Sequence, residues 1–243
     1  MMTLHSEAVR LDQVQFAWPK SPHLVIDIEQ LTVKTNQHVF IKGPSGSGKS
    51  TLLSLLTGMM TPQTGEIHLL GHNLGQLTQA QRDQFRSHHI GYIFQQFNLL
   101  PYLSVIENVL LPCRFSHLRQ RQTTHNHHTA EQQAEQLLHR LQLPADCFQR
   151  SVNQLSIGQQ QRVAAARALI GQPELIIADE PTSSLDADNR QVFIELLLEE
   201  ANQSGATVLF VSHDASLQRY FERCIDLTDI NRVNPFTSAE KLS

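Results

Sequence analysis

The chain alternates between two patterns of hydrophobic and polar positions. Toward the N-terminus, short β-prone segments at residues 14–18, 24–28 and 31–33 are separated by turns, which predicts an antiparallel layer. A hairpin-like segment at residues 65–71 has the same character and belongs to that layer. Continuous apolar runs instead predict strands that are buried on both faces of a parallel sheet. These runs lie at residues 38–42, 90–94, 174–179 and 206–212.

The middle of the chain has a helical pattern. From about residue 97 to about residue 158, leucines recur at helical spacing, as in residues 134–141. The sequence contains no internal repeats. The two patterns together predict an α/β fold with a parallel-sheet core, an antiparallel β layer and an inserted helical lobe.

A glycine-rich segment connects the apolar run that ends at Ile41 to the leucine-rich stretch that starts at Thr51. Gly43 to Ser50 reads G-P-S-G-S-G-K-S, which fits the pattern G-x-x-x-x-G-K-[ST]. The glycines let successive N–H groups point at phosphates, and the helix N-terminus that follows favours an anion. Lys49 is expected to reach the β- and γ-phosphates and Ser50 to bind Mg²⁺. An ordinary Gly/Ser turn would not need the flanking strand and helix, so the predicted core is that of a P-loop NTPase.

Two acidic residues end a later apolar strand. The run from Leu175 leads into Asp179 and Glu180. Asp179 stands where open α/β sheets bind ligands and is suited to hold Mg²⁺ through a water, and Glu180 is the candidate general base. An isolated Asp-Glu pair would indicate a solvated strand end. Because this pair follows a phosphate loop, a catalytic role is favoured.

Further segments follow in a fixed order. Gln95 comes after the run at 90–94, L-S-I-G-Q at 155–159 precedes an Ala-rich helix, P-T-S-S-L-D occupies 181–186, and His213 ends the run at 206–212. With these motifs the chain resembles the ATP-binding subunit of an ABC transporter, from about Trp18 to His213. The resemblance implies one ATP-binding domain over residues 1–243. Residues 1–95 and 159–243 would form the β layer and nucleotide core, and residues 96–158 a helical signature subdomain.

The resemblance also implies roles for individual residues. The catalytic set would be Lys49, Gln95, Glu180 and His213, with His213 on the γ-phosphate. Mg²⁺ would be held by Ser50, Gln95 and Asp179. ATP would be bound by Trp18, by the Walker A loop of Gly43, Pro44, Ser45, Gly46, Ser47, Gly48, Lys49, Ser50 and Thr51, and by Ser156, Gly158, Gln159 and Asp186.

Two of these residues also have other interpretations, and one position beside them departs from the family pattern. Trp18 stands where the family has an aromatic residue that stacks on adenine, but the only Trp of a chain can also be an ordinary apolar residue. His213 taken alone would indicate a hydrogen-bonded core imidazole. Ile157 departs from the family, which has a glycine there; a branched side chain disfavours φ > 0, but its backbone N–H donates equally well at negative φ.

The implied activity is ATP hydrolysis coupled to transport. In the family the signature loop contacts ATP on a second subunit, so the resemblance implies a homodimer around two ATP molecules and a separate membrane permease. Residues 95–101 and the start of the helix near Arg162 resemble bacterial exporters of the lipoprotein-releasing and macrolide-efflux type. The alternatives are a soluble ABC ATPase that acts in regulation, translation or repair, and a nucleotide-gated module that does not hydrolyse. A second cassette or long coiled coil, typical of the first, is not present in this sequence, and intact catalytic motifs argue against the second.

Composition is consistent with a peripheral subunit on the cytoplasmic face of the cell membrane. At 243 residues and 40% hydrophobic, the chain is long enough for one sizeable core. No apolar run approaches the roughly 18 residues that span a bilayer, and the N-terminus does not have a signal-peptide pattern. A net charge of -4 without a basic block argues against nucleic acid as the main partner. Cys113, Cys147 and Cys224 are interpreted as reduced thiols.

Residues 116–136 are rich in Gln, Thr and His. The H-x-H-H spacing of His125, His127 and His128, with His117 before it, permits two metal ligands from one loop. No Cys lies near enough in sequence to complete a site, and the polar neighbours are typical of a solvated, variable extension. The second interpretation is preferred, and no metal site is assigned to this stretch.

Overall fold

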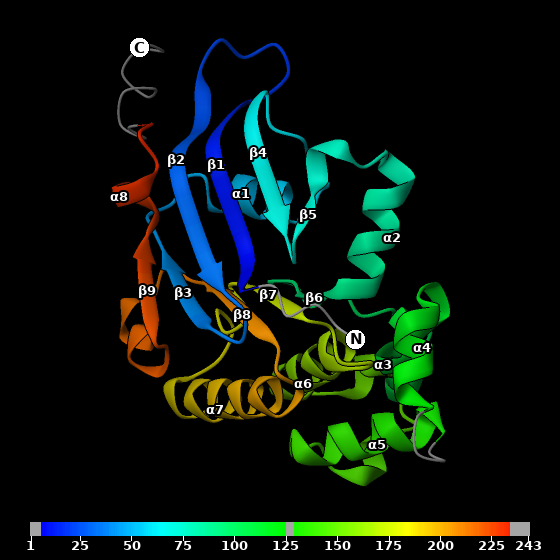
Figure 1. The fold of residues 1–243 in the computed structure, drawn as a ribbon. Helices are drawn as coiled ribbons and strands as arrows, with labels where there is room; N and C mark the ends of the chain where they lie inside the picture. Colours follow the sequence, from blue (N-terminus) through cyan, green and yellow to red (C-terminus); the bar gives the residue numbers. More distant parts are fainter. Residues whose placement is uncertain (1–5, 125–128, 234–243) are drawn as a thin grey trace. The chain divides into compact units, whose positions relative to one another are not determined.

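The computed structural model describes residues 6–124 and 129–233 and divides into two compact units (Figure 1). The first unit contains the residues up to Arg86 and those from Leu209 onward, and the second runs from Ser87 to Val208. The boundaries fall inside helix α2 (Gln79–His89) and strand β8 (Thr207–Val211), so the chain leaves the first unit within a helix and returns to it within a strand.

An antiparallel sheet of four strands forms one layer of the first unit, in the order β2-β1-β4-β5 (Figure 1). Apolar residues such as Val9 and Leu11 are buried where they alternate with polar ones along β1. Leu11 lies opposite Leu31 on β2 and Ile67 on β4, so three apolar side chains meet in this sheet. The strands are β1 (Glu7–Ala17), β2 (Leu24–Lys34), β4 (Thr64–Leu69) and β5 (His72–Asn73).

A bulge at Gln13 changes which positions of β1 face the core. The buried side chains fall at Leu11 before the bulge and at Val14 after it, an odd and then an even position. Gln13 has a φ of 50°, and the pairing with β4 slips by one residue at this point. Gly65 permits the close approach, because a Cβ there would lie 2.2 Å from the Gln13 carbonyl oxygen.

A parallel strand pair in the first unit leads into the glycine-rich loop. Strand β3 (His38–Lys42) pairs with β9 (Arg223–Asp226), and the segment after β8 is joined to β3 by a hydrogen bond of 3.1 Å from the Ser212 N–H to the Ile41 carbonyl. Helix α1 begins directly after the loop and buries its leucines. The helices of this unit, besides the first part of α2, are α1 (Lys49–Leu56), η1 (Leu74–Gln76), η5 (Ala215–Tyr220) and α8 (Leu227–Ile230).

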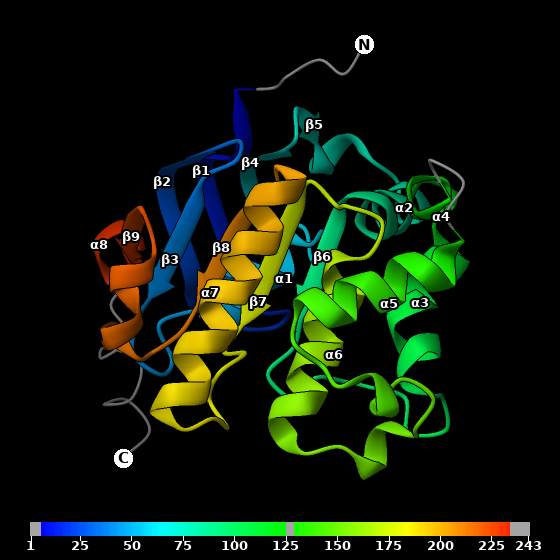
Figure 2. The same ribbon diagram turned by 90° about the horizontal axis from the view of Figure 1, so that it is seen from below.

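The second unit combines a parallel strand pair with helices. Strand β6 (Ile90–Ile93) pairs with β7 (Leu175–Asp179), and helix α6 packs against α3 and α5 (Figure 2). Gly91 lets β6 pass the end of α6, because a Cβ at this position would lie 2.2 Å from the Ala168 carbonyl oxygen. The helices are α3 (Val105–Phe115), α4 (His117–Thr123), α5 (Ala130–Arg140), η3 (Ala145–Cys147), η4 (Val152–Gln154), α6 (Ile157–Leu169) and α7 (Ala187–Ser204).

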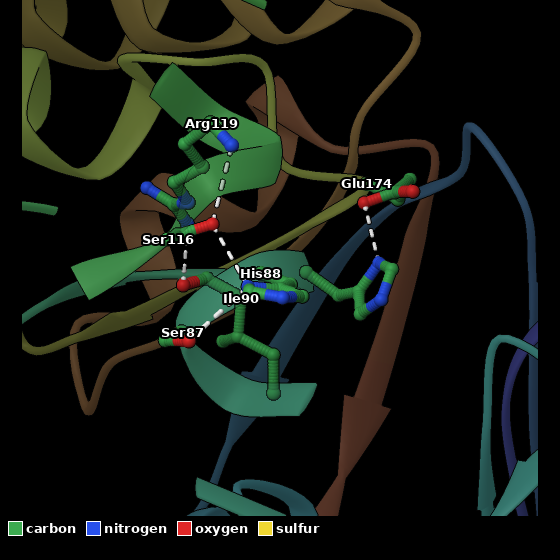
Figure 3. Close-up of polar contacts among 7 residues, drawn as sticks. Ser87, His88, Ile90, Ser116, Arg119 and Glu174 are labelled. Atoms are coloured by element: carbon green, nitrogen blue, oxygen red, sulfur yellow. Dashed lines mark hydrogen bonds and ion pairs between the residues drawn. The ribbon is translucent and has the colours of Figure 1, made fainter. Parts of the chain in front are cut away.

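A buried arginine on α4 forms hydrogen bonds with other elements of the second unit (Figure 3). Arg119 is only 1% exposed and donates to the carbonyl oxygens of Ile90 at 2.6 Å and Ala168 at 3.3 Å. Ser116 caps the helix by accepting a bond from the Arg119 N–H at 3.1 Å. Burial lowers the pKa of Arg119 to about 10. The expectation of a solvated extension at residues 116–136 is therefore wrong for α4, which contributes a buried side chain to the unit.

His88 lies beside Ser116 at the start of α4 (Figure 3). Nδ1 of His88 lies 2.9 Å from the Ser116 hydroxyl, and Nδ1 of His89 lies 3.1 Å from Oε2 of Glu174. The ring of His117 is 5.5 Å from that of His88. Burial, followed by the neighbouring positive charges, lowers the pKa of His88, so its neutral form is favoured.

The strands predicted at residues 38–42, 90–94, 174–179 and 206–212 are present as β3, β6, β7 and β8. The two segments predicted at 24–28 and 31–33 form one strand, because β2 pairs with β1 along its whole length. The sequence pattern missed β9 (Arg223–Asp226), which is too short and too polar to show a period. Helices occupy the predicted helical stretch between residues 97 and 158.

Candidate nucleotide-binding site

The glycine-rich loop of the first unit has the backbone of an anion cradle. Gly46 and Gly48 have φ values of 81° and 98°, in the left-handed region that glycine adopts readily. Gly48 is the N-cap of α1, so the unpaired N–H groups of the first helical turn open toward the loop. A Cβ on Gly43 would lie 2.6 Å from the Ser47 hydroxyl oxygen, which shows how tightly the loop curls on itself.

Lys49 places its positive charge over this loop. Its ammonium donates to the carbonyl oxygens of Gly43 at 2.7 Å and Pro44 at 3.1 Å. These bonds hold the side chain across the loop, where it is positioned to attract phosphate oxygens. Ser50 is exposed beside it, while Thr51 is buried at the base of α1. The predicted loop residues 43–51 are thus contiguous in the chain, with Pro44, Ser45, Gly46 and Ser50 exposed and Gly43, Ser47 and Thr51 buried.

Two other predicted residues belong to the first unit. Trp18 follows β1, is 45% exposed, and packs edge-to-face on Phe16 with ring centroids 5.5 Å apart. One face of a ring held in this way can still stack on a planar ligand. His213 is exposed and comes directly after Ser212, whose bond to Ile41 joins it to the strand that leads into the loop.

In the second unit, Gln95 and Asp179 stand at the carboxyl ends of paired strands. Ile93 lies opposite Ala178 in the parallel register of β6 and β7, so Gln95 follows one strand at the edge where Asp179 ends the other. The hydroxyl of Tyr92 donates to Oδ2 of Asp179 at 3.4 Å. Burial, followed by the Asp179 charge, raises the pKa of Tyr92, which keeps the phenol protonated as a donor. Sequence reasoning missed Tyr92, for which no local motif gave a signal.

Glu180 has a strained backbone. Its φ is 47°, which places a residue with a Cβ in the left-handed region, and it is 9% exposed. Strand β7 ends at Asp179, so the orientation of Glu180 is set by this dihedral and not by the alternation of the strand. Gln161 of α6 donates to the next carbonyl, that of Pro181, at 2.8 Å. Backbone strain of this kind persists where the surroundings impose it, and it concentrates at functional sites.

The signature segment opens helix α6. Ser156 is its N-cap: its hydroxyl accepts from the Gln159 N–H at 3.3 Å, and the Gln159 side chain accepts from the Ser156 N–H at 2.9 Å. Ile157 is the first helical residue and is 53% exposed. A Cβ on Gly158 would have only the Leu185 side chain within 4 Å, at 3.8 Å, so the surface over this turn is open.

An open groove of about 480 Å³ brings the signature segment together with the segment that starts α7. Ser156, Gly158, Gln159 and Asp186, to which the resemblance assigns contacts with ATP, all line it. Asp186 caps α7 by accepting from the Asn189 N–H at 2.9 Å and from the Asn189 amide at 2.8 Å. These bonds lower the pKa of Asp186 and keep it ionised.

A residue far away in sequence contacts the phosphate loop. Asn231, after α8, donates from its amide to the Ser47 carbonyl oxygen at 3.2 Å. Sequence reasoning missed this contact, because the two residues are 184 positions apart and Asn231 belongs to no motif.

Among residues 6–124 and 129–233, no group of three or more His, Cys, Asp or Glu side chains is arranged to hold a metal ion. His125, His127 and His128 lie outside the described residues. No helix within the same ranges combines the length and apolarity needed to cross a bilayer.

Comparison with known proteins identifies the relatives of this chain. Residues 27–183 match the ABC transporter family. An ABC transporter ATP-binding protein of Methanocaldococcus jannaschii is 38% identical over 82% of this chain and 83% of its own length. The lipoprotein-releasing system ATP-binding protein LolD of Bacteroides fragilis is 36% identical over 86% of this chain and 91% of its own length.

The solved structures that resemble this chain are also ATP-binding cassettes. A dimeric ATP-binding cassette in a post-hydrolysis state, bound to ADP and Pi, has a TM-score of 0.78 to this chain at 35% identity. The match covers 91% of this chain and 94% of the solved one. These likenesses confirm the predicted α/β fold of the P-loop NTPase type, with a parallel sheet, an antiparallel β layer and helices.

Proposed function

The chain belongs to the ABC transporter family, in which it is an ATP-hydrolysing cassette, and we propose that it dimerises around two ATP molecules to drive a separate membrane permease. One observation carries the proposal: the loop at 43–51 has left-handed glycines, a helix N-terminus and the Lys49 ammonium in one place. Each of these features favours the triphosphate of a nucleotide.

ATP binding is assigned first to this loop. Its N–H groups and Lys49 neutralise the phosphates, Trp18 stacks on the adenine, and His213 donates to the γ-phosphate. The exposure of Trp18 and His213 supports these roles, because both side chains can be reached by a ligand.

Mg²⁺ fits the oxygen-bearing side chains that the sequence singled out. Ser50 offers a hydroxyl, Asp179 a carboxylate and Gln95 an amide oxygen, and Mg²⁺ prefers oxygen ligands. When bound, the ion offsets negative charge on the phosphates. The Tyr92 hydroxyl orients the Asp179 carboxylate, as outer-sphere partners of metal ligands commonly do.

Water activation is assigned to Glu180. A carboxylate that takes the proton of the attacking water must be held in one orientation. The left-handed backbone of Glu180 and the bond from Gln161 to the Pro181 carbonyl support this assignment, because they fix the turn that carries the carboxylate.

The open groove at residues 156–159 and 184–186 supports the proposed dimer. The Ser156 hydroxyl and the first N–H groups of α6 make this groove suitable for an anion that a second copy presents. The homologous cassette solved as a dimer with ADP and Pi supports the same arrangement. Closure on ATP binding and opening after hydrolysis would then form the working cycle.

A membrane permease is the proposed partner, and export the proposed direction. The relatives include LolD of a lipoprotein-releasing system and a macrolide export ATP-binding/permease protein of Rhodopirellula baltica, of which this chain covers 28%. Near Gln95, the side chain of Phe97 is buried, whereas Tyr102 is 77% exposed and available for docking. The chain would therefore act peripherally, on the cytoplasmic face of the membrane.

Co-purification tests this proposal against a soluble ABC ATPase without a membrane partner. The tagged chain is expected to bring down a stoichiometric multi-span protein from detergent-solubilised membranes of its native cell, and that protein should stimulate its ATPase rate. An active ATPase that remains without any membrane protein would favour the soluble alternative. A protein that binds ATP and does not turn it over would favour a non-hydrolysing module.

A further inference from the structure

The side chain of Asn231 uses all of its hydrogen-bonding capacity at the back of the phosphate loop. It is buried, and its amide nitrogen donates to the carbonyl oxygens of Val25 at 3.0 Å and Ser47 at 3.2 Å. Its amide oxygen accepts from the backbone N–H groups of Asp27 at 2.8 Å and Val233 at 3.4 Å. Two donors and two lone pairs are thus all engaged, so the amide can have only one orientation.

Strand β2 supplies a rigid support for this amide. Asn231 forms an antiparallel bridge with Ile28, and the Arg232 N–H donates to the Asp27 carbonyl at 2.9 Å. The segment after α8 therefore lies along the edge strand of the four-stranded sheet. A donor fixed on a strand holds its acceptor more firmly than one on a free loop.

The contact with Ser47 determines how the loop presents its next N–H group. In a planar trans peptide, the C=O of Ser47 and the N–H of Gly48 point in opposite directions. Because the Ser47 carbonyl is held toward Asn231, the Gly48 N–H is aimed away from β2. Gly48 itself is closely backed, since a Cβ there would lie 2.9 Å from Cδ1 of Ile26 and 3.6 Å from the Asn231 amide nitrogen.

We infer that Asn231 is a positioning residue for nucleotide binding, which holds the Ser47–Gly48 peptide in its phosphate-binding orientation before the nucleotide arrives. The inference rests on the proposed role of the loop. Preorganisation of this kind raises affinity, because the loop need not be ordered when the ligand binds. The loss of the bond is expected to weaken ATP binding about tenfold, which is the scale of one buried hydrogen bond.

The variant Asn231→Asp tests this with little change of shape. One carboxylate oxygen still accepts from the Asp27 N–H, but the other faces the carbonyl oxygens of Val25 and Ser47 and repels them when ionised. When protonated, the same oxygen becomes a donor again, and burial favours the protonated form. The ratio of the variant to wild-type Kd for ATP, measured by calorimetry, should fall from about tenfold near pH 8 toward unity near pH 5.5. Taking the ratio at each pH cancels the ionisation of ATP.

Two further variants separate positioning from general stability. Asn231→Leu keeps the approximate volume without a donor, so its loss of affinity should be the same at every pH. Arg232→Ala removes the ion pair with Glu29 and loosens the same segment, but leaves the contact with Ser47, so its affinity should match wild type. All Kd values are corrected for the folded fraction, measured by circular dichroism.

The outcomes distinguish this inference from the proposed function. An Asn231→Asp protein that binds ATP like wild type at both pH values would refute the positioning role while leaving the nucleotide site intact. Equal losses in Arg232→Ala and Asn231→Leu would show that the segment merely stabilises the fold. If the wild type itself binds no ATP, or binds it equally well as Lys49→Ala, the assignment of the loop fails instead.

Discussion

The hydroxyl of Tyr92 lies 3.4 Å from Oδ2 of Asp179, and the two residues stand on the paired parallel strands β6 and β7. The phenol is kept protonated by burial and by the charge of Asp179. It therefore acts on the carboxylate as a neutral donor, which leaves the charge available for a cation. A substitution of Tyr92 therefore tests the proposed Mg²⁺ site without replacing any of the proposed ligands.

Replacing Tyr92 with Phe should raise the Mg²⁺ concentration needed for half-maximal ATPase activity by severalfold to about tenfold, because the carboxylate loses its orienting partner. The rate at saturating Mg²⁺ should change little. The ring packing on Phe94, with centroids 4.3 Å apart, is kept, so the thermal midpoint should stay close to that of wild type. Tyr220→Phe, which removes a hydroxyl that pairs with Arg219, serves as the control. An unchanged Mg²⁺ dependence in Tyr92→Phe would exclude the orienting role.

Glu180→Gln should keep ATP binding and lower turnover at least about 100-fold, since a general base commonly contributes that much. The variant should also accumulate as an ATP-bound dimer in size-exclusion chromatography, because closure no longer ends in hydrolysis. The substitution leaves the left-handed backbone at position 180 unchanged, so the stability of the variant should match that of wild type. The matched control is Glu195→Gln, an exposed carboxylate on α7. Turnover near wild type in Glu180→Gln would remove Glu180 from the role of base.

The sequence alone predicts those features whose residues lie next to one another along the chain. The loop at 43–51 lies in one segment, so its glycines and Lys49 identify it without any tertiary information. The strands β3, β6, β7 and β8 are likewise visible as continuous apolar runs, because a strand buried on both faces has no polar positions.

The sequence did not reveal contacts that depend on the folded chain. Asn231 reaches Ser47 across 184 residues, and its neighbours in sequence give no period or motif. Arg119 was assigned to a solvated stretch because its surroundings are polar, yet carbonyl oxygens of β6 and α6 compensate its burial. For Arg119, hydrogen bonding to distant backbone overrode the composition of the segment.

Trp18 provides an optical test of adenine stacking. It is the only Trp, so a change in tryptophan emission on addition of ATP reports on this ring alone. Trp18→Ala should weaken ATP binding by about 1 kcal/mol, the scale of an aromatic pair beyond simple burial. Trp18→Phe should retain most of the affinity, since a flat apolar face remains. Flat emission together with unchanged affinity in Trp18→Ala would place the adenine elsewhere.

Arg119→Met should destabilise the protein by about 3 kcal/mol, because the carbonyl oxygens of Ile90 and Ala168 would be left buried without their donor. The free energy of unfolding in urea measures this loss. Arg121→Met, on the exposed face of the same helix, should stay within about 0.5 kcal/mol of wild type. If both variants were equally stable, the buried arginine would contribute nothing net to the fold.

Ile157 tests whether the departure from the family pattern impairs the signature segment. The residue begins α6 with a helical backbone, so the turn makes no demand for glycine, and its side chain is 53% exposed. Ser156 and Gln159 still form the capping box, which keeps the N–H groups of the helix start in place.

The wild-type ATPase rate per molecule should therefore rise with protein concentration, as dimerisation requires, and Ile157→Gly should increase it no more than a few fold. Glycine costs about 1 kcal/mol in a helix interior, and a smaller cost at the first position of α6 limits any gain. Ile157→Ala keeps the helix propensity and removes only the branched bulk, so it is the matched control. An inactive wild type that either substitution rescues would mean that the isoleucine side chain crowds the partner's ATP, and that activity requires the permease or a different subunit.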